Sequence, residues 1–326
     1  MKKMLAVLVH LSMHMWPKRY DMLPFDDAVW ERTIRKAAQC GFNTIVLDVG
    51  DGIQFQSHPE IAMNGAWSRE RVKAEVARCK AMGLALIPKL NFSAAHDMWL
   101  GAYREMQTTP TYHQVTGDLI REVYELFDHP EYIHLGMDEE KEGFVSHNQR
   151  PGALYWKDFR HLVDCVKATG ARPWIWADPL FMHPLDYATH FAPDEAVLSP
   201  WYYHAFRREH FTPTDSTQEY FDFYTKGRFG HLKLRFVEDD PFHATFRSVA
   251  LPLMHQGFSY VPCASVYNNC KYNTPEMVEY FVNGAPEDRL VGFMTAPWFA
   301  TTQENWPKIE QSLELMGEAA KTYLKA

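Results

Sequence analysis

The chain alternates between short apolar segments and longer segments in which apolar residues recur every three or four positions. An apolar run of about four to eight residues is typical of a buried strand, and the longer spacing predicts an amphipathic helix. The predicted strands cover residues 5–11, 44–48, 84–90, 132–136, 173–177, 196–199, 258–264 and 290–294. The predicted helices cover residues 27–40, 68–82, 110–127, 155–169, 274–282 and 304–324. Gly41, Gly83, Gly170 and Gly257 each follow a helix, where a left-handed residue is favoured.

This alternation predicts an α/β fold, a single (β/α)8 TIM barrel. The strands are apolar almost throughout, which favours a parallel sheet covered on both faces. Eight strand–helix units close naturally into such a barrel. No linker divides the chain, so we expect one domain over residues 1–326. The segment 201–255 fits the pattern least, because it is long, aromatic and charged, and we expect an insertion around it.

Composition and charge exclude several function classes. The formal net charge is −8 without a long run of one sign, which provides no basic surface for nucleic acid or for an anionic membrane. No apolar stretch reaches the ~20 residues that a membrane-spanning helix needs. The five cysteines form no CxxC pair, which argues against a zinc knuckle or a disulfide framework.

The first thirteen residues imitate a secretion signal, with two lysines before an apolar run. They lack a small-residue cleavage site, and His10 interrupts the run, so we interpret them as the first strand. A cytoplasmic location follows if the chain is made as written, and an exported one if a signal has been removed. The sequence leaves the location and the oligomeric state open.

Polar and aromatic side chains gather at the carboxyl ends of the predicted strands, where barrels of this kind carry their sites. The candidates for substrate binding are His14, Asp51, Asn91, His96, Trp174, Trp176, Trp201, Tyr267 and Trp298. Flat aromatic faces stack on sugar rings, and amides and carboxylates bond sugar hydroxyls, so this set indicates a carbohydrate. A tryptophan at a strand end can instead cap the barrel core, and that alternative stays open for each of the four.

Three consecutive acids, Asp138, Glu139 and Glu140, follow the fourth predicted strand. Together with His134 and Gly136 they form the pattern H-x-G-x-D-E, which resembles the signature of family 20 glycoside hydrolases, the β-N-acetylhexosaminidases. Weaker similarities lie in residues 12–17, which look like the family's S-R-H-x-x-P, and in residues 83–96, which look like its strand-three segment. Asp51 and Trp298 also lie where the family has an acidic loop and a tryptophan.

This resemblance implies a retaining, substrate-assisted glycosidase that acts on an amino-sugar glycoside without a cofactor. It makes Glu139 the general acid, and it makes Asp138 the residue that orients the 2-acetamido group, whose carbonyl oxygen attacks the anomeric carbon. Adjacent carboxylates suit an acid catalyst, because like charges favour keeping one of them protonated. Tyr267 becomes the candidate for the tyrosine that bonds the acetamide oxygen. Glu140 has no role in the family, and we interpret it as a supporting residue or a helix cap.

The sequence also departs from the family pattern. Met13 replaces the strand-one arginine that grips sugar hydroxyls, and Lys89 and Asn91 replace a glutamate and an aspartate after strand three. We therefore expect an altered sugar subsite. Two alternatives to a glycosidase remain, a non-catalytic carbohydrate-binding barrel and a metal-dependent hydrolase. The second is disfavoured for His10 and His14, which on one strand would lie about 13 Å apart.

Overall fold

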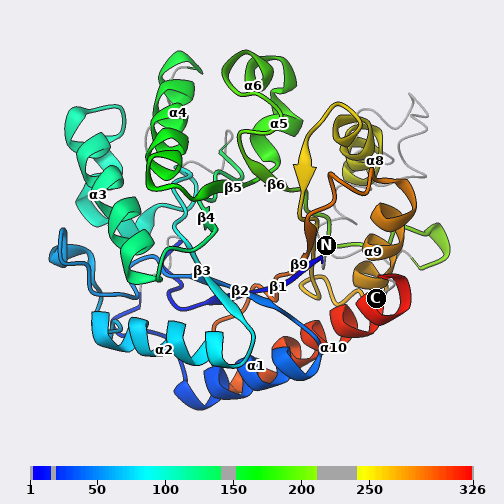
Figure 1. The fold of residues 1–326 in the computed structure, drawn as a ribbon, viewed down its shortest axis with the longest axis horizontal. Helices are drawn as coiled ribbons and strands as arrows, with labels where there is room; N and C mark the ends of the chain where they lie inside the picture. Colours follow the sequence, from blue (N-terminus) through cyan, green and yellow to red (C-terminus); the bar gives the residue numbers. More distant parts are fainter. Residues whose placement is uncertain (1–2, 16–19, 141–151, 211–240, 325–326) are drawn as a thin grey trace, which may run out of the picture.

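The computed structural model describes residues 3–15, 20–140, 152–210 and 241–324. Its centre is one parallel sheet of nine strands in the order β7-β6-β5-β4-β3-β2-β1-β9-β8, and helices surround it (Figure 1). The strands are β1 Met4–His10, β2 Thr44–Asp48, β3 Ala85–Lys89, β4 Tyr132–His134, β5 Arg172–Trp176, β6 Val197–Ser199, β7 Ser259–Tyr260, β8 Cys263–Ala264 and β9 Gly292–Thr295.

The ring closes through the segment that contains β7 and β8. Val261 donates its backbone N–H to Leu198 O on the β6 side, and Met294 of β9 donates to Pro262 O on the other side. β7 and β8 are thus two halves of the seventh barrel strand, which the sequence predicted as one strand over residues 258–264. Pro262 lies between the halves and has no N–H to offer the sheet, which explains the interruption. The predicted (β/α)8 TIM barrel is confirmed.

The helices cover the outer face of the sheet, as the amphipathic pattern predicts. They are α1 Asp27–Gln39, α2 Arg69–Ala81, α3 Pro110–Leu126, α4 Gly152–Thr169, α5 Asp178–Met182, α6 Pro184–His190, α8 Pro241–Met254, α9 Asn273–Gly284 and α10 Trp306–Tyr323. Short 3-10 turns occur at η1 Pro59–Ile61, η2 Met98–Met106, η3 Arg208–His210 and η6 Gln303–Asn305. Ser68 caps α2 by accepting from Arg71 N. The four glycines that were expected to end helices all have positive φ.

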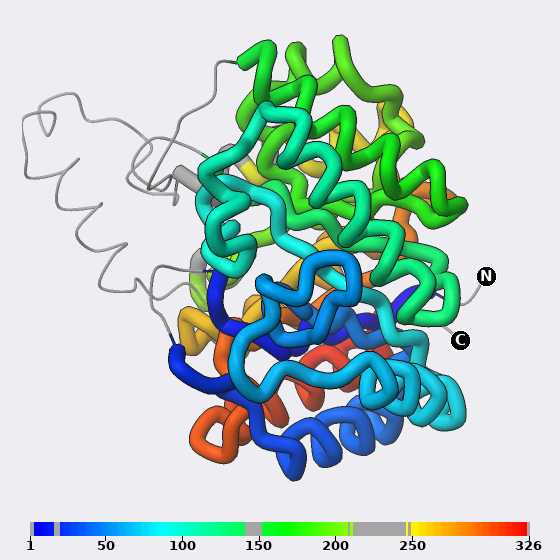
Figure 2. The backbone as a smooth tube through the Cα atoms, turned by 90° about the vertical axis from the view of Figure 1, so that its left-hand side faces the viewer, coloured from blue at the N-terminus to red at the C-terminus, as the bar shows by residue number. Residues whose placement is uncertain are grey.

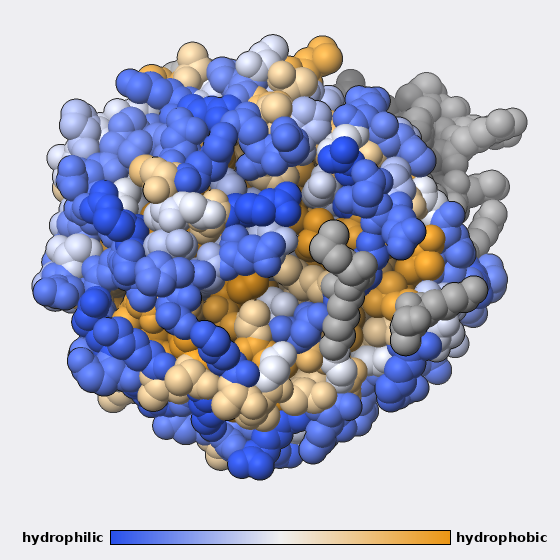
Figure 3. Space-filling model, viewed as in Figure 1, coloured by the Kyte–Doolittle hydropathy of each residue, from blue (hydrophilic) through white to orange (hydrophobic). Residues whose placement is uncertain are grey.

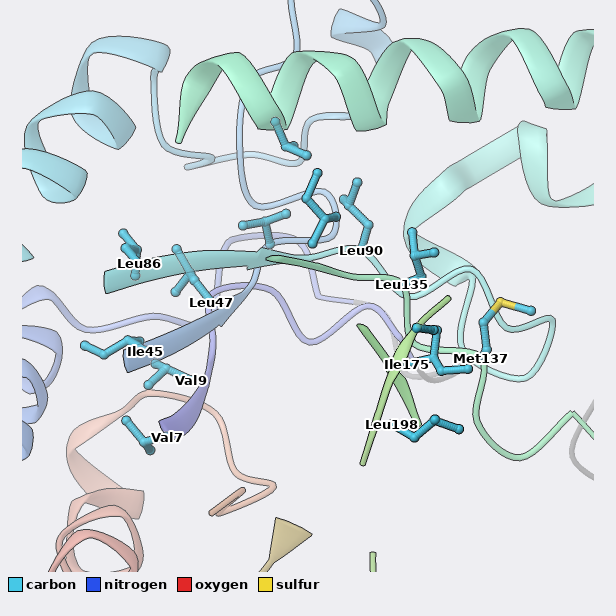
Figure 4. Packing of buried hydrophobic residues seen from close by; sticks show 14 of the residues in the cluster. Val7, Val9, Ile45, Leu47, Leu86, Leu90, Leu135, Met137, Ile175 and Leu198 are labelled. Carbon is cyan, nitrogen blue, oxygen red and sulfur yellow. The ribbon is translucent and has the colours of Figure 1, made fainter. Parts of the chain in front are cut away.

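Alternating side chains divide the strands into an outer and an inner layer. Outward residues such as Val7, Ile45 and Leu198 pack under the helices in the larger core cluster (Figure 4). Inward residues such as Leu8, Val46 and Trp174 fill the barrel in a second, smaller cluster. Towards the carboxyl ends of the strands the inward positions become polar. The candidate site therefore lies at this polar end of the barrel interior.

The opposite end of the barrel is a polar surface around a cavity. Figure 3 views this face, on which β1 begins and α10 ends (compare Figure 2), and shows hydrophobic residues surrounded by hydrophilic ones. The cavity has a volume of about 850 Å³ and is lined by residues that include Lys3, Asn43, Arg172, Asp194 and Arg289. The predicted insertion around 201–255 lies largely outside the described residues, of which 201–210 and α8 are its described parts. No described helix is long and apolar enough to cross a bilayer.

Candidate active site

The floor of the site is a layer of inward-facing polar residues on adjacent strands. The strand register aligns His10 with Asp48, Asp48 with Lys89, and Lys89 with His134. Lys89 Nζ donates to Asp48 Oδ2 at 2.6 Å, and His10 Nδ1 lies 3.2 Å from the same oxygen. Burial alone would raise the pKa of Asp48, but the Lys89 charge and His10 lower it to about 2. The charge of Lys89 is therefore neutralised inside the barrel and does not reach the rim.

His134 of the H-x-G-x-D-E pattern belongs to this floor and is fully buried. Its Nδ1 accepts from Gly136 N at 3.0 Å, which assigns the ring proton to Nε2. Burial, followed by the nearby Lys89 charge, lowers the pKa of His134 well below its usual value, so the ring is neutral. The first residue of the pattern thus shapes the turn that leads to the acids.

The glycine of the pattern allows two loops to meet. Gly136 has φ 74°, and a Cβ at this position would lie 2.0 Å from Asn91 Oδ1. Only glycine fits this approach and this backbone conformation. In return, Asn91 Nδ2 donates to Asp138 Oδ1 at 2.9 Å, and Ser93 Oγ donates to the Asp138 carbonyl. The strand-three loop therefore fixes Asp138 on both its side chain and its main chain.

His96 joins the two candidate catalytic carboxylates. Its Nε2 lies 3.2 Å from Glu139 Oε2 and 3.4 Å from Asp138 Oδ2. Burial alone would lower the pKa of His96, but the charges of Asp138 and Glu139 outweigh burial and raise it. Glu139 is partly exposed, whereas His96 and Asp138 are buried, so the acid faces the open side of the site. Glu140 accepts from Ala94 N at 3.2 Å, which agrees with its predicted supporting role.

A third carboxylate, Asp178, packs behind this pair. Its Oδ1 accepts from Glu139 N at 3.1 Å, and its Oδ2 accepts from Trp201 Nε1 at 2.7 Å. Burial, followed by the charge of Asp138, raises the pKa of Asp178 to about 7. Asp178 is the first residue of α5, and its side chain turns to the site rather than capping that helix.

Aromatic side chains form a wall beside the carboxylates. The Trp176 and Trp298 rings lie 5.6 Å apart, and Tyr203 lies 6.2 Å from Trp298 and stacks on Trp201 at 5.2 Å. The indole N–H of Trp176 is buried and has no hydrogen-bond partner among the described residues. Burial raises the pKa of the Tyr203 hydroxyl well above its usual range. Polar groups that are buried without a partner are suited to receive the polar atoms of a ligand.

Two of the predicted aromatic candidates lie elsewhere. Trp174 is completely buried in the barrel interior, where its Nε1 donates to Ser199 Oγ at 2.8 Å. It supports the floor, which is the core-capping alternative that the sequence left open. Tyr267 is 54% exposed, and its ring contacts Phe299 at 6.2 Å. Tyr203, which follows β6 and was not among the predicted site residues, is the half-buried tyrosine of the aromatic wall.

The side of the rim formed by β1 and β2 holds His14 and Asp51. His14 Nδ1 lies 2.6 Å from Asp51 Oδ2, and Ser12 Oγ donates to the other Asp51 oxygen. His14 Nε2 accepts from Tyr20 N at 2.6 Å, so His14 Nδ1 carries the proton that it gives to Asp51. Met13, which lies between Ser12 and His14 in the sequence, is buried. Residues 16 and 17 of the strand-one similarity lie outside the described residues.

Comparison with known proteins supports the fold. The sequence matches no protein-family profile and no curated protein. Solved structures do match, and they include the β-N-acetylhexosaminidase from Streptomyces coelicolor (TM-score 0.61, 95% of this chain and 63% of that chain) at 13% identity. Dispersin B matches at 13% identity over 98% of this chain and 99% of its own (TM-score 0.59). A family 20 β-N-acetylglucosaminidase matches at 13% identity over 95% of this chain and 68% of that chain (TM-score 0.57).

The chain has the fold of the family 20 catalytic barrel. It spans about two thirds of the length of the S. coelicolor structure and nearly all of Dispersin B. At 13% identity the likeness concerns the fold, and the roles of single residues depend on the geometry described above. In that geometry the D-E pair, His96 and Asn91 meet at one point of the rim.

Proposed function

We propose that this protein is a glycoside hydrolase that cleaves a terminal amino-sugar glycoside with retention of configuration and with help from the substrate's own acetamido group. The observation that carries the proposal is the clustering of Glu139, Asp138 and His96 beside the Trp176–Trp298 wall. A general acid, a fixed carboxylate and an aromatic wall are the groups that such a reaction requires. The solved structures with this fold bear hexosaminidase names, which supports the same substrate class.

Each group has a specific task in the proposed reaction. Glu139, partly exposed and within 3.2 Å of His96, donates a proton to the leaving oxygen as the glycosidic bond breaks. Asp138, held by Asn91 and Ser93, receives the acetamide N–H and directs its carbonyl oxygen to the anomeric carbon. The carboxylate also balances the positive charge of the cyclised intermediate. Water then opens that intermediate with Glu139 acting as the base, which restores the original anomer.

Buried donors beside the acids favour an acyl-bearing sugar over a simple hexose. The indole N–H of Trp176, which is buried without a hydrogen-bond partner among the described residues, and the half-buried Tyr203 lie in the aromatic wall. An acetamide brings a carbonyl oxygen that can accept from such donors and a methyl group that packs on indole faces. Tyr203 therefore replaces Tyr267 as our candidate for the acetamide-binding tyrosine.

The test is hydrolysis of aryl glycosides whose N-acyl group carries zero, one, two or three fluorines. Fluorine withdraws electrons from the carbonyl oxygen, so a substrate-assisted reaction slows steeply along the series. Proton NMR of the first product gives the anomer, which we expect to be the retained one. A flat fluorine series would contradict substrate assistance, and an inverted anomer would contradict the whole mechanism. Ligand binding without hydrolysis of any aryl hexosaminide would favour a non-catalytic carbohydrate-binding barrel.

One observation favours a metal-dependent hydrolase as a second candidate. His96, Asp138 and Glu139 each place one potential ligand atom within 4.8 Å of the others, close enough for one cation. Hydrolysis that disappears with a chelator and returns with a divalent cation would select this candidate. We expect chelation to leave the rate unchanged.

A further inference from the structure

Asp178 contacts both the candidate acid and the aromatic wall, but the proposed reaction gives it no task. It is partly buried, and its two oxygens accept from two different elements, the β4 loop through Glu139 N and the segment after β6 through Trp201 Nε1. Neither donor belongs to Asp178's own helix, α5. A carboxylate placed in this way is a bridge between the acid and the aromatic wall.

We propose that Asp178 is a positioning residue that fixes the Glu139 main chain and the Trp201 indole in one arrangement, so that the acid and the sugar platform are set together. This inference rests on the proposed function, because it assigns Glu139 the acid's task. Asp178 does not contact the substrate in this proposal and is not a catalytic residue.

The backbone of Glu139 explains why such a residue is needed. Glu139 has φ 54°, and Met137 two positions earlier has φ 71°, so two residues that carry a Cβ adopt the left-handed conformation in one short loop. This conformation costs free energy for both of them and persists only where surrounding contacts enforce it. The Glu139 N–H bond to Asp178 is one such contact, and it sets the direction in which the Glu139 side chain leaves the loop.

The two donors also explain why the residue is an aspartate. A carboxylate has two acceptor oxygens, and when it is ionised its hydrogen bonds are stronger than those of a neutral acceptor. An asparagine would offer one oxygen and would turn an NH₂ group towards the second donor. Because both Glu139 N and Trp201 Nε1 are donors, an amide satisfies only one of them. Asp178→Asn is therefore a nearly isosteric change that breaks the bridge.

The kinetic test compares Asp178→Asn with the wild type on two kinds of aryl or alkyl glycoside. A misplaced Glu139 fails to protonate a poor leaving group, whereas an activated phenol departs without a proton. We expect kcat to fall about 10- to 100-fold on a substrate with a poor leaving group, as for the loss of one charge-assisted bond. On the activated substrate we expect less than about a threefold change. A merely structural role would reduce both rates by the same factor.

Two variants serve as controls. Trp201→Phe removes the indole donor and leaves the bond to Glu139 N, so we expect it to raise KM without changing the leaving-group dependence. Asp158→Asn removes another buried carboxylate, which is bonded to His113 between α3 and α4, and controls for the general cost of losing a buried charge. Equal rate losses on both substrates for Asp178→Asn would overturn the proposal, provided that urea unfolding shows the variant to be folded.

A spectroscopic measurement separates this inference from the proposed function. Protein labelled with 5-fluorotryptophan gives one fluorine resonance for each of the ten tryptophans, and Trp201→Phe identifies the resonance of Trp201. We expect Asp178→Asn to shift this resonance and Asp158→Asn to leave it in place. A shift without any hydrolysis by the wild type would refute the proposed function and leave the bridge standing. An unshifted Trp201 resonance would refute the bridge whether or not the wild type is active.

Discussion

The two sides of the carboxyl-terminal rim are built differently. On the side of β3, β4 and β5, which we call the acid side, Asn91, His96 and Asp178 all direct polar atoms to Asp138 or Glu139. On the side of β1 and β2, which we call the strand-one side, Ser12 and His14 direct theirs to Asp51. The acid side thus keeps its carboxylates ready for a reacting group, whereas the strand-one side satisfies its carboxylate within the protein.

This difference indicates that recognition has changed more than chemistry. The H-x-G-x-D-E pattern lies on the acid side, where the contacts of its residues explain why they occur in the pattern. The strand-one side lacks the arginine of the family pattern, and the buried Met13 brings no charge. Lys89 does not compensate, because Asp48 neutralises it inside the barrel. We therefore expect the strongest mutational effects on the acid side and a substrate preference that depends on the strand-one side.

The largest effect is expected for Glu139→Gln. This variant keeps the shape of the side chain and removes the proton donor, and a general acid contributes about 10²–10⁴-fold. We expect kcat/KM to fall by this factor on natural glycosides and by much less on an activated aryl glycoside. Steady-state rates on both substrates provide the measurement. Wild-type rates on both would mean that Glu139 lies on a solvated loop without a catalytic task.

Asp138→Asn should show a different kinetic pattern. If Asp138 orients the acetamide and balances the cyclised intermediate, its loss affects the reacting centre whatever the leaving group. We expect a decrease of about 10²–10³-fold on both kinds of substrate, by analogy with the loss of one electrostatic contact to a transition state. Comparing the leaving-group dependence of the two variants is the check. The same dependence for both would refute this division of labour on the acid side.

A smaller effect is expected on the strand-one side. Without the arginine of the family pattern, ordinary terminal N-acetylglucosaminides lose a charged hydrogen bond worth about 1.5–3 kcal/mol. We expect kcat/KM on a simple aryl N-acetylglucosaminide to lie about 10- to 100-fold below that on the preferred substrate. A panel of aryl glycosides that differ at the sugar hydroxyls measures this preference. Efficient turnover of the simple substrate would show that the strand-one side has not altered sugar recognition, and it would contradict the proposed difference between the two sides.

The sequence predicted the barrel well where local signals are strong. β2 has the predicted bounds, because its apolar run is continuous, and α2 begins one residue after its predicted start at Ser68, which caps it. The two helices α5 and α6 were missed because they have five and seven residues, too short to show a helical period. The seventh strand is divided at Pro262. Hydrophobic periodicity alone does not predict this interruption, because it takes no account of the N–H that proline lacks.

The site was predictable only in part, and for a physical reason. The D-E pair stands out because its motif is local in sequence, and the strand ends pointed to Asn91, His96, Trp176 and Trp298. The contacts of Asp178 with Glu139 and Trp201 join segments that lie 39 and 23 positions away. Burial distinguishes Trp174 in the floor from the more accessible Trp201, although both follow similar apolar patterns. Such pairings depend on loop geometry, which the sequence pattern does not specify.

The smallest expected effect is a pH-dependent stability difference that originates on the acid side. Burial and the charge of Asp138 raise the pKa of Asp178 to about 7 in the folded protein, against an ordinary value of 3.8. Between these values the folded state holds a proton that the unfolded state has released, so this group's contribution to stability declines as pH rises from about 4 to 7.

We expect urea unfolding at pH 5, 6, 7 and 8 to reveal this decline as a difference between the wild type and Asp178→Asn, which does not titrate at that position. One unit of pKa corresponds to about 1.4 kcal/mol, which is the upper limit of the slope for a single group. We expect the free energy of unfolding of the wild type to lose about 0.5–1 kcal/mol per pH unit relative to the variant. Above pH 7 the two curves should run parallel. The raised pKa of His96 and the lowered pKa of His134 also make stability depend on pH, but both proteins contain these residues and their contributions largely cancel. Asp158→Asn is the matched control and should follow the wild-type slope. Parallel curves from pH 5 to pH 7 would mean that the pKa of Asp178 is not raised in the folded protein. In that case the carboxylates of the acid side would be no more constrained by their surroundings than Asp51 is on the strand-one side.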